Sequence, residues 1–161
     1  MRAMNRELEL TLTARNSALA EARNALELSL TELASVRDTE TGGHLLRLQH
    51  YSEYLAKEVS NSPAFRGLID VEFIMTLSEC APLHDIGKVG IPDAILLKPG
   101  KLTPEERSVM EQHTVIAAEV LGNVASKHRS ALGFMKMATE VARHHHERYD
   151  GTGYPGTKEV L

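Results

Sequence analysis

The sequence predicts an all-α protein, and three observations support this fold class. From Asp38 onward, apolar residues recur at helical spacing between short loops, and no segment reads as a convincing strand. Up to Val36 the chain contains no Pro or Gly, and good helix formers such as Ala, Leu, Glu and Arg dominate. Residues 103–106 form a clear helix start, because Thr103 can cap, Pro104 fits the first turn and Glu106 completes a capping box.

The composition is that of an ordinary globular protein and excludes several classes. Of 161 residues, 42% are hydrophobic and 25% are charged, with a net charge of -4. This charge gives no general attraction to nucleic acid or to anionic membranes. Cys80 is the single cysteine, which excludes an internal disulfide and fits a reducing cytoplasm. No apolar run approaches the ~18 residues that a membrane helix needs, so we expect a cytoplasmic protein with no membrane contact.

Residues 1–37 form a first segment, which we predict to be one long helix. Its main feature is a leucine every seven residues, at positions 12, 19, 26 and 33. The positions three residues further on are mixed in character, as in a modest parallel coiled coil, which would make the protein a dimer. A single amphipathic helix packed on its own domain is the alternative. We also expect that this helix relays signals from an upstream domain and that the chain belongs to a longer protein.

Residues 38–161 form the second segment, a helical domain. Asp38 or Thr39 can cap a helix that ends near Ser60, before Asn61-Ser62-Pro63. Its expected inner stripe is Leu45, Leu48, Tyr51, Leu55 and Val59. A second helix is predicted over 70–83, with its last turn bent or shortened by Pro82. An irregular stretch from Gly87 to Gly100 follows, with at most a short helix over 92–97. The remaining predicted elements are helices over 104–124 and 131–146 and a turn-rich loop over 150–155.

Histidines clustered with acidic residues are the main chemical signal, because imidazole and carboxylate bind first-row divalent metals. Glu40 and His44 are four residues apart and share a helix face, although such pairs are more often solvated helix-start contacts. His84 and Asp85 are adjacent, so they can face one ion only if the backbone departs from a regular helix, which Gly87 permits. Taken alone, His113 is more typical of a histidine whose hydrogen bonds are satisfied within the protein than of a metal ligand.

A second histidine cluster spans residues 144–147. Three adjacent histidines cannot all face one site, so one pair together with Glu147 is the expected arrangement. The turn signals that follow argue against an affinity-tag remnant.

Five segments, in order over residues 38–155, resemble the HD-GYP domain, a subfamily of the HD metal-dependent phosphohydrolases. The segments are residues 40–44 (ETGGH), 84–93 (HDIGKVGIPD), 98–103 (KPGKLT), His113 and 145–155 (HHERYDGTGYP). The resemblance implies a phosphodiesterase that hydrolyses cyclic di-GMP to pGpG, GMP or both, in bacterial second-messenger signalling. It also implies two or three divalent ions, Fe or Mn, and protein partners such as an upstream receiver or sensor domain of a two-component system and diguanylate-cyclase-type proteins.

The resemblance also assigns roles to residues. The implied metal ligands are Glu40, His44, His84, Asp85, His113, His145 and His146, which leaves His144 as a neighbour. Asp85 would bridge two ions and, with Lys88, serve catalysis; Lys88 would also bind the scissile phosphate and protonate the leaving oxygen. The loop residues Asp150, Gly151, Gly153, Tyr154 and Pro155 would be mainly structural.

Two departures from the family pattern follow Pro155. HD enzymes usually carry a further metal-binding Asp on a downstream helix and a basic segment that holds the substrate phosphates, and neither is present here. We therefore expect that the C-terminal part of the domain is missing and that this chain is inactive or weakly active. The alternatives are an inactive cyclic di-GMP sensor, a dimerisation or protein-interaction module, and a phosphohydrolase of other nucleotides.

Overall fold

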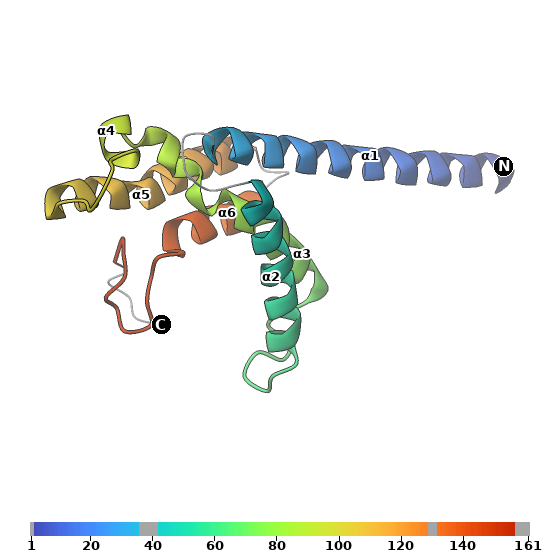
Figure 1. Ribbon diagram of the computed structural model, residues 1–161. Helices are drawn as coiled ribbons and strands as arrows, with labels where there is room; N and C mark the ends of the chain where they lie inside the picture. Colours follow the sequence, from blue (N-terminus) through green and yellow to red (C-terminus); the bar gives the residue numbers. More distant parts are fainter. Residues whose placement is uncertain (1, 36–41, 129–131, 157–161) are drawn as a thin grey trace.

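A computed structural model describes residues 2–35, 42–128 and 132–156, and these residues contain helices and loops but no strand. The all-α prediction is confirmed (Figure 1). The elements in chain order are α1 (Arg2–Ser35), α2 (Gly42–Ser60), α3 (Val71–Cys80), the 3₁₀ helix η1 (Ala81–Gly90), α4 (Asp93–Leu96), α5 (Pro104–Lys127) and α6 (Leu132–His144).

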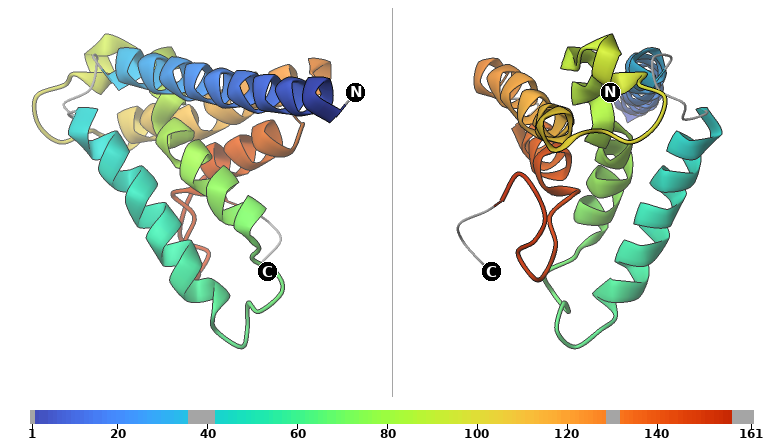
Figure 2. Two further views of the ribbon diagram at one scale, coloured as in Figure 1. Left: turned by 90° about the vertical axis from the view of Figure 1, so that its right-hand side faces the viewer. Right: turned by 60° about the vertical axis from the view of Figure 1, so that its left-hand side comes forward.

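The long first helix is present as predicted, and it extends well beyond the other helices at its N-terminal end (Figure 1). Its C-terminal part contacts η1 and α2, which places α1 along one side of the bundle (Figure 2). Within the described part of the chain, no helix is both long and apolar enough to cross a bilayer.

The predicted helix starts are confirmed wherever the structure describes them. Asp70 caps α3, accepting a hydrogen bond from the backbone N–H of Phe73 at 2.7 Å. Thr103 and Glu106 form the predicted capping box of α5, which runs three residues past the expected end at Val124. The proposed caps of α2, Asp38 and Thr39, lie outside the described residues.

The inner stripe predicted for α2 is partly wrong. Leu45 is buried, but Tyr51 and Leu55 are exposed, and Ala56 is buried instead. Leu48 and Val59 of the predicted stripe are half-buried, as are the polar residues Gln49 and Ser52. The stripe is therefore narrower than predicted and partly polar.

Two further expectations need correction. Pro82 shortens the predicted helix as expected, because α3 ends at Cys80, but the chain then continues to Gly90 as the 3₁₀ helix η1 rather than as the irregular stretch expected from Gly87. α6 ends at His144, two residues before the predicted end. The short helix expected within 92–97 is confirmed as α4.

The core lies where η1, α5 and α6 meet, and its small side chains bring the helices close together. Its buried members are Cys80, Leu83, Ala117, Leu121, Ala138 and Ala142. Gly87 shows how close the approach is, because a Cβ at this position would lie 1.9 Å from the backbone oxygen of His113 on α5. This packing sets the distance between the motif on η1 and the histidine on α5.

Candidate metal centre

The tight winding of η1 aligns the polar residues of its motif. In a 3₁₀ helix, residues three apart are eclipsed, and the Lys88 Nζ lies 2.8 Å from the Asp85 Oδ2. The same carboxylate oxygen is 3.0 Å from the Nε2 of His84. The backbone does depart from a regular α-helix, as the sequence required. Gly87 contributes through close packing on α5 rather than through an unusual backbone angle.

The second oxygen of Asp85 faces histidines from two other elements. His113 is fully buried on α5, and its Nε2 lies 3.3 Å from the Asp85 Oδ1. His145, just beyond the end of α6, places its Nε2 3.5 Å from the same oxygen and 3.3 Å from the Nε2 of His113. Asp85 therefore connects all three elements.

Backbone carbonyls fix the orientation of three of these imidazoles in the same way. The Nδ1 of His84 lies 3.0 Å from the oxygen of Ala81, that of His113 lies 2.7 Å from Met110, and that of His145 lies 3.0 Å from Ala142. A carbonyl oxygen only accepts, so each Nδ1 carries the proton and donates. In a neutral ring the Nε2 then presents a lone pair, and all three Nε2 atoms point at Asp85.

This convergence of electron pairs fits a bound cation. The Oδ1 of Asp85 is buried and has no hydrogen-bond partner among the described residues, because a neutral ring donating through Nδ1 has no proton left on Nε2. Asp85, His113, His145 and His146 each offer a ligand atom within 4.8 Å of the others. Imidazole nitrogens around one carboxylate are a donor set for a first-row divalent metal.

The ionisation of the cluster agrees with this chemistry. Burial raises the pKa of Asp85, but the hydrogen bonds that His113, His145 and His84 donate when their Nε2 atoms are protonated outweigh it and hold the pKa far below its usual range. Asp85 is therefore a carboxylate. Burial, with repulsion from His145 and His113, lowers the pKa of His146 to about 4, so this ring is neutral at pH 7 and its lone pair is available.

The end of α6 separates the three consecutive histidines. His144 points away from the cluster, with its Nε2 3.4 Å from Glu140 and its Nδ1 3.8 Å from Glu147. Glu147 accepts a hydrogen bond from the backbone N–H of Gly156 at 2.9 Å. The structure thus brings His145 and His146 to the cluster but not Glu147, contrary to the arrangement expected from the residue types alone.

The loop after α6 packs directly against His146. The Tyr154 ring stacks on the His146 ring, with centroids 4.5 Å apart and planes inclined by 24°. The Tyr154 N–H donates to the His146 oxygen at 3.3 Å, and the Tyr154–Pro155 peptide is cis. Gly153 permits this approach, since a Cβ there would lie 2.4 Å from the same oxygen. Burial raises the pKa of Tyr154, which keeps its hydroxyl protonated.

Asp150 holds the first turn of this loop. Its Oδ1 accepts from the backbone N–H of Thr152 at 3.0 Å and from its hydroxyl at 2.6 Å, while Gly151 adopts a φ of +72°. This positive φ favours glycine. The loop residues thus support the geometry around His146.

The remaining sequence candidates lie at the edge of the site or outside the described residues. His44, on α2, has its ring centroid 6.3 Å from that of His84. Glu40 lies outside the described residues. Sequence reasoning missed the three orienting carbonyls and the stacking of Tyr154 on His146, because backbone groups leave no signature in residue types.

The fold and the cluster together define a class: a helical-bundle domain whose His and Asp side chains converge as a metal site. The family model of the HD domain matches residues 30–160, and the chain belongs to the HD domain family. This confirms the family to which the motifs pointed.

Curated relatives are similar to the chain over most of its length. The chain is 46% identical over 145 residues to a cyclic di-GMP phosphodiesterase of Vibrio cholerae, a match that covers 90% of the chain and 29% of the relative. It is 45% identical over 131 residues to a cyclic di-GMP phosphodiesterase of Thermotoga maritima, covering 81% and 32%. A 3'3'-cGAMP-specific phosphodiesterase of V. cholerae is 39% identical over 137 residues, covering 85% and 24%. The chain thus spans at most about a third of these relatives.

Proposed function

We propose that the protein is a metal-dependent phosphodiesterase that hydrolyses cyclic di-GMP to pGpG, GMP or both. The observation that carries this proposal is the convergence of three carbonyl-oriented Nε2 atoms on the buried carboxylate of Asp85. The names of the relatives from V. cholerae and T. maritima support the substrate.

The two oxygens of Asp85 face two sets of histidines, so the residues fit more than one ion. Asp85 Oδ1, His113, His145 and His146 would hold one divalent ion. Asp85 Oδ2 and His84, with His44 beyond it, would hold a second, together with Glu40. Two or three ions, with Fe or Mn favoured by the histidine-rich donor set, remain our proposal. Such ions supply an activated water and stabilise charge on the phosphate.

The protein's own side chains have distinct roles in this proposal. Lys88 lies against Asp85 at the edge of the centre, where its ammonium can contact a substrate phosphate and give a proton to the departing sugar oxygen as the P–O bond breaks. Asp85 and its histidines fix the position of the phosphate relative to Lys88. The hydroxyl of Tyr154 stays protonated and its ring closes the site beside His146.

Metal content and turnover measured on the same samples test the proposal. The protein should bind Mn²⁺ or Fe²⁺ by elemental analysis, and Asp85→Asn should lose both the metal and cyclic di-GMP hydrolysis. His144→Ala is the matched control, because this adjacent histidine faces Glu140 instead of the centre. Turnover that is unchanged by Asp85→Asn would refute a metal-dependent mechanism. Absence of turnover in the metal-loaded, unsubstituted protein would favour the inactive sensor or the interaction module.

3'3'-cGAMP is a second candidate substrate, since three relatives from V. cholerae are named for it. Hydrolysis of the two cyclic dinucleotides in competition, followed by separation of the products, decides between them.

We also propose, from the heptad and the family resemblance, a cytoplasmic homodimer paired through α1. An upstream receiver or sensor domain and diguanylate-cyclase-type partners belong to the same proposal. Sedimentation of the intact chain and of a form lacking residues 1–37 tests the dimer, and a dimer that persists without α1 contradicts it.

A further inference from the structure

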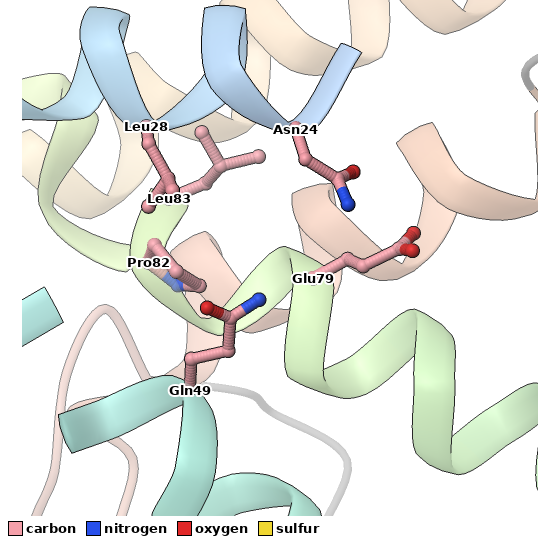
Figure 3. Close-up of a pocket in the computed structure, with 6 residues that line it drawn as sticks. All are labelled: Asn24, Leu28, Gln49, Glu79, Pro82 and Leu83. Atoms are coloured by element: carbon pink, nitrogen blue, oxygen red, sulfur yellow. The ribbon is translucent and has the colours of Figure 1, made fainter. Parts of the chain in front are cut away.

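The face of α1 that contacts the domain is its less apolar one. Asn24 and Leu28 line a small pocket with Gln49, Glu79, Pro82 and Leu83, from α2, α3 and η1 (Figure 3). Thr31, one turn further, is only 3% exposed. The face toward the bundle therefore combines Asn24 and Thr31 with Leu28, and the four leucines of the seven-residue repeat do not belong to it.

Arg23 holds α1 in this orientation. Its guanidinium pairs with Glu79 on α3 and lies 5.1 Å from the ring centroid of Phe134 on α6. A cation over an aromatic ring is attractive and favours one rotation of the helix. The contact ties α1 to two helices of the bundle.

The leucine row of α1, Leu12, Leu19, Leu26 and Leu33, points the other way. These four side chains are 51–68% exposed. At 100° per residue, Leu26 and Leu33 lie about 160–180° around the helix from Asn24. α1 therefore packs on its own domain mainly through the opposite face, and this packing leaves the leucine row largely uncovered.

At its C-terminal end the leucine row runs into an apolar groove. The groove has a volume of about 680 Å³ and lies between α1, η1 and α5. Its α1 wall includes Leu33, the last leucine of the row, and Leu30. Val89 on η1 and Val120 on α5 also line it, and both are more than half exposed. The leucine row and the groove thus form one continuous surface.

We propose that a second copy of this chain covers this surface, with the two α1 helices parallel along the leucine rows and their C-terminal ends closing over the grooves. This goes beyond pairing through α1 alone, because it places the outer side of η1, the helix that carries Asp85, in the interface.

Three features identify the occupant as a second copy. A repeat of seven residues matches a helix with the same repeat, and in a parallel pair each leucine meets its own counterpart. α1 has 34 residues, so it offers roughly 50 Å of contact. The flanking positions that face each other across a parallel pair, such as Met4 with Glu9 and Thr11 with Asn16, combine no like charges. The net charge of -4 disfavours an anionic membrane as the occupant.

Cysteine cross-linking tests the helix pairing, and the chain suits it because its one cysteine, Cys80, is fully buried. Leu19→Cys should give a disulfide-linked dimer under mild oxidation, since a parallel pair brings the two introduced thiols together. Ser17→Cys is the matched control: it is exposed on the opposite face of α1 and should stay monomeric on a denaturing gel. Equal cross-linking of both variants, or none of Leu19→Cys, overturns the pairing.

The groove is tested separately by sedimentation equilibrium. Val120→Ser should weaken dimerisation roughly tenfold or more, because apolar surface is lost in both subunits. Glu119→Ser, exposed on α5 but not in the groove, should leave the dissociation constant unchanged. Thermal unfolding confirms that both variants are folded.

An unchanged dissociation constant of the Val120→Ser dimer refutes the role of the groove. An unsubstituted protein that is monomeric at all concentrations refutes the second copy as the occupant and leaves the surface to a different chain. Metal content and turnover are measured on the same variants. Loss of dimerisation with metal still bound therefore separates this inference from the proposed phosphodiesterase.

Discussion

Gly87→Ala is the substitution that the packing of η1 on α5 resists most strongly. The added Cβ would lie 1.9 Å from the backbone oxygen of His113 and 2.9 Å from its carbonyl carbon and from the nitrogen of Ala117. Real Cβ contacts essentially never fall below 3.0 Å. The obstacle is helix backbone, which no change of rotamer moves, so η1 and α5 must separate by more than 1 Å.

The expected loss of stability lies at the upper end of the range for overpacking. Extra methyl groups in a packed core cost about 1–3 kcal/mol when neighbouring side chains adjust. Because backbone must move here, we expect about 3 kcal/mol or more, which is a large fraction of the roughly 5–15 kcal/mol that stabilises a typical domain. Separation of the helices would also lengthen the 3.3 Å contact between Asp85 and His113 and weaken metal binding.

Chemical denaturation and metal titration measure the two effects, with Gly90→Ala as the control. A Cβ at Gly90 would meet only the side chain of Ile116, at 3.0 Å, and this flexible chain can shift. We expect a loss below about 1 kcal/mol and unchanged metal affinity for Gly90→Ala. If Gly87→Ala unfolds within about 1 kcal/mol of the unsubstituted protein, the close packing of η1 on α5 is wrong.

Three further predictions concern single contacts. Tyr154→Ala should weaken metal binding about tenfold, because it releases the His146 ring, whereas Tyr154→Leu should keep part of the packing and lose less metal affinity. Equal metal affinities of the two variants in calorimetric titration would contradict this. Thr103→Ala should lower the free energy of unfolding by about 1 kcal/mol in urea titrations, because α5 loses its cap, and no loss would argue against the cap. Hydrogen bonds from Lys98 and the Thr103 backbone lower the pKa of Glu106. The stability that ionised Glu106 contributes is therefore present above its unfolded pKa near 4.5 and is lost as the pH falls through its folded pKa. Glu106→Gln should reduce the loss of unfolding free energy at acid pH, and an unchanged loss would refute this role of Glu106.

Helix starts with a local chemical signature could be predicted from the sequence. The cap at Thr103 needs only neighbouring residues, so it reads directly from the chain, and the structure confirms it. The buried face of α2 depends on which neighbours it meets. Gln49 and Ser52 are half-buried there while Leu55 is exposed, so hydrophobicity alone identifies only part of this face.

The candidate site was predictable in its residue types and less so in its geometry. His113 gave a weak signal on its own, because a histidine in mid-helix looks the same whether it meets solvent or a carboxylate. Its position opposite Asp85 results from the contact at Gly87, which joins residues distant in sequence. The stacking of Tyr154 on His146 likewise depends on a loop that turns back by way of Gly153.

The pairing of Asp85 with Lys88 has a consequence for the order in which ligands bind. With the imidazoles neutral, one carboxylate and one ammonium leave the described cluster with a formal charge close to zero. A dianionic cyclic dinucleotide gains little electrostatic attraction from such a site. Each divalent ion that enters adds two positive charges in a region of low dielectric, where they act strongly. Affinity for the anionic ligand should therefore rise steeply with metal occupancy, so the two binding events are thermodynamically linked.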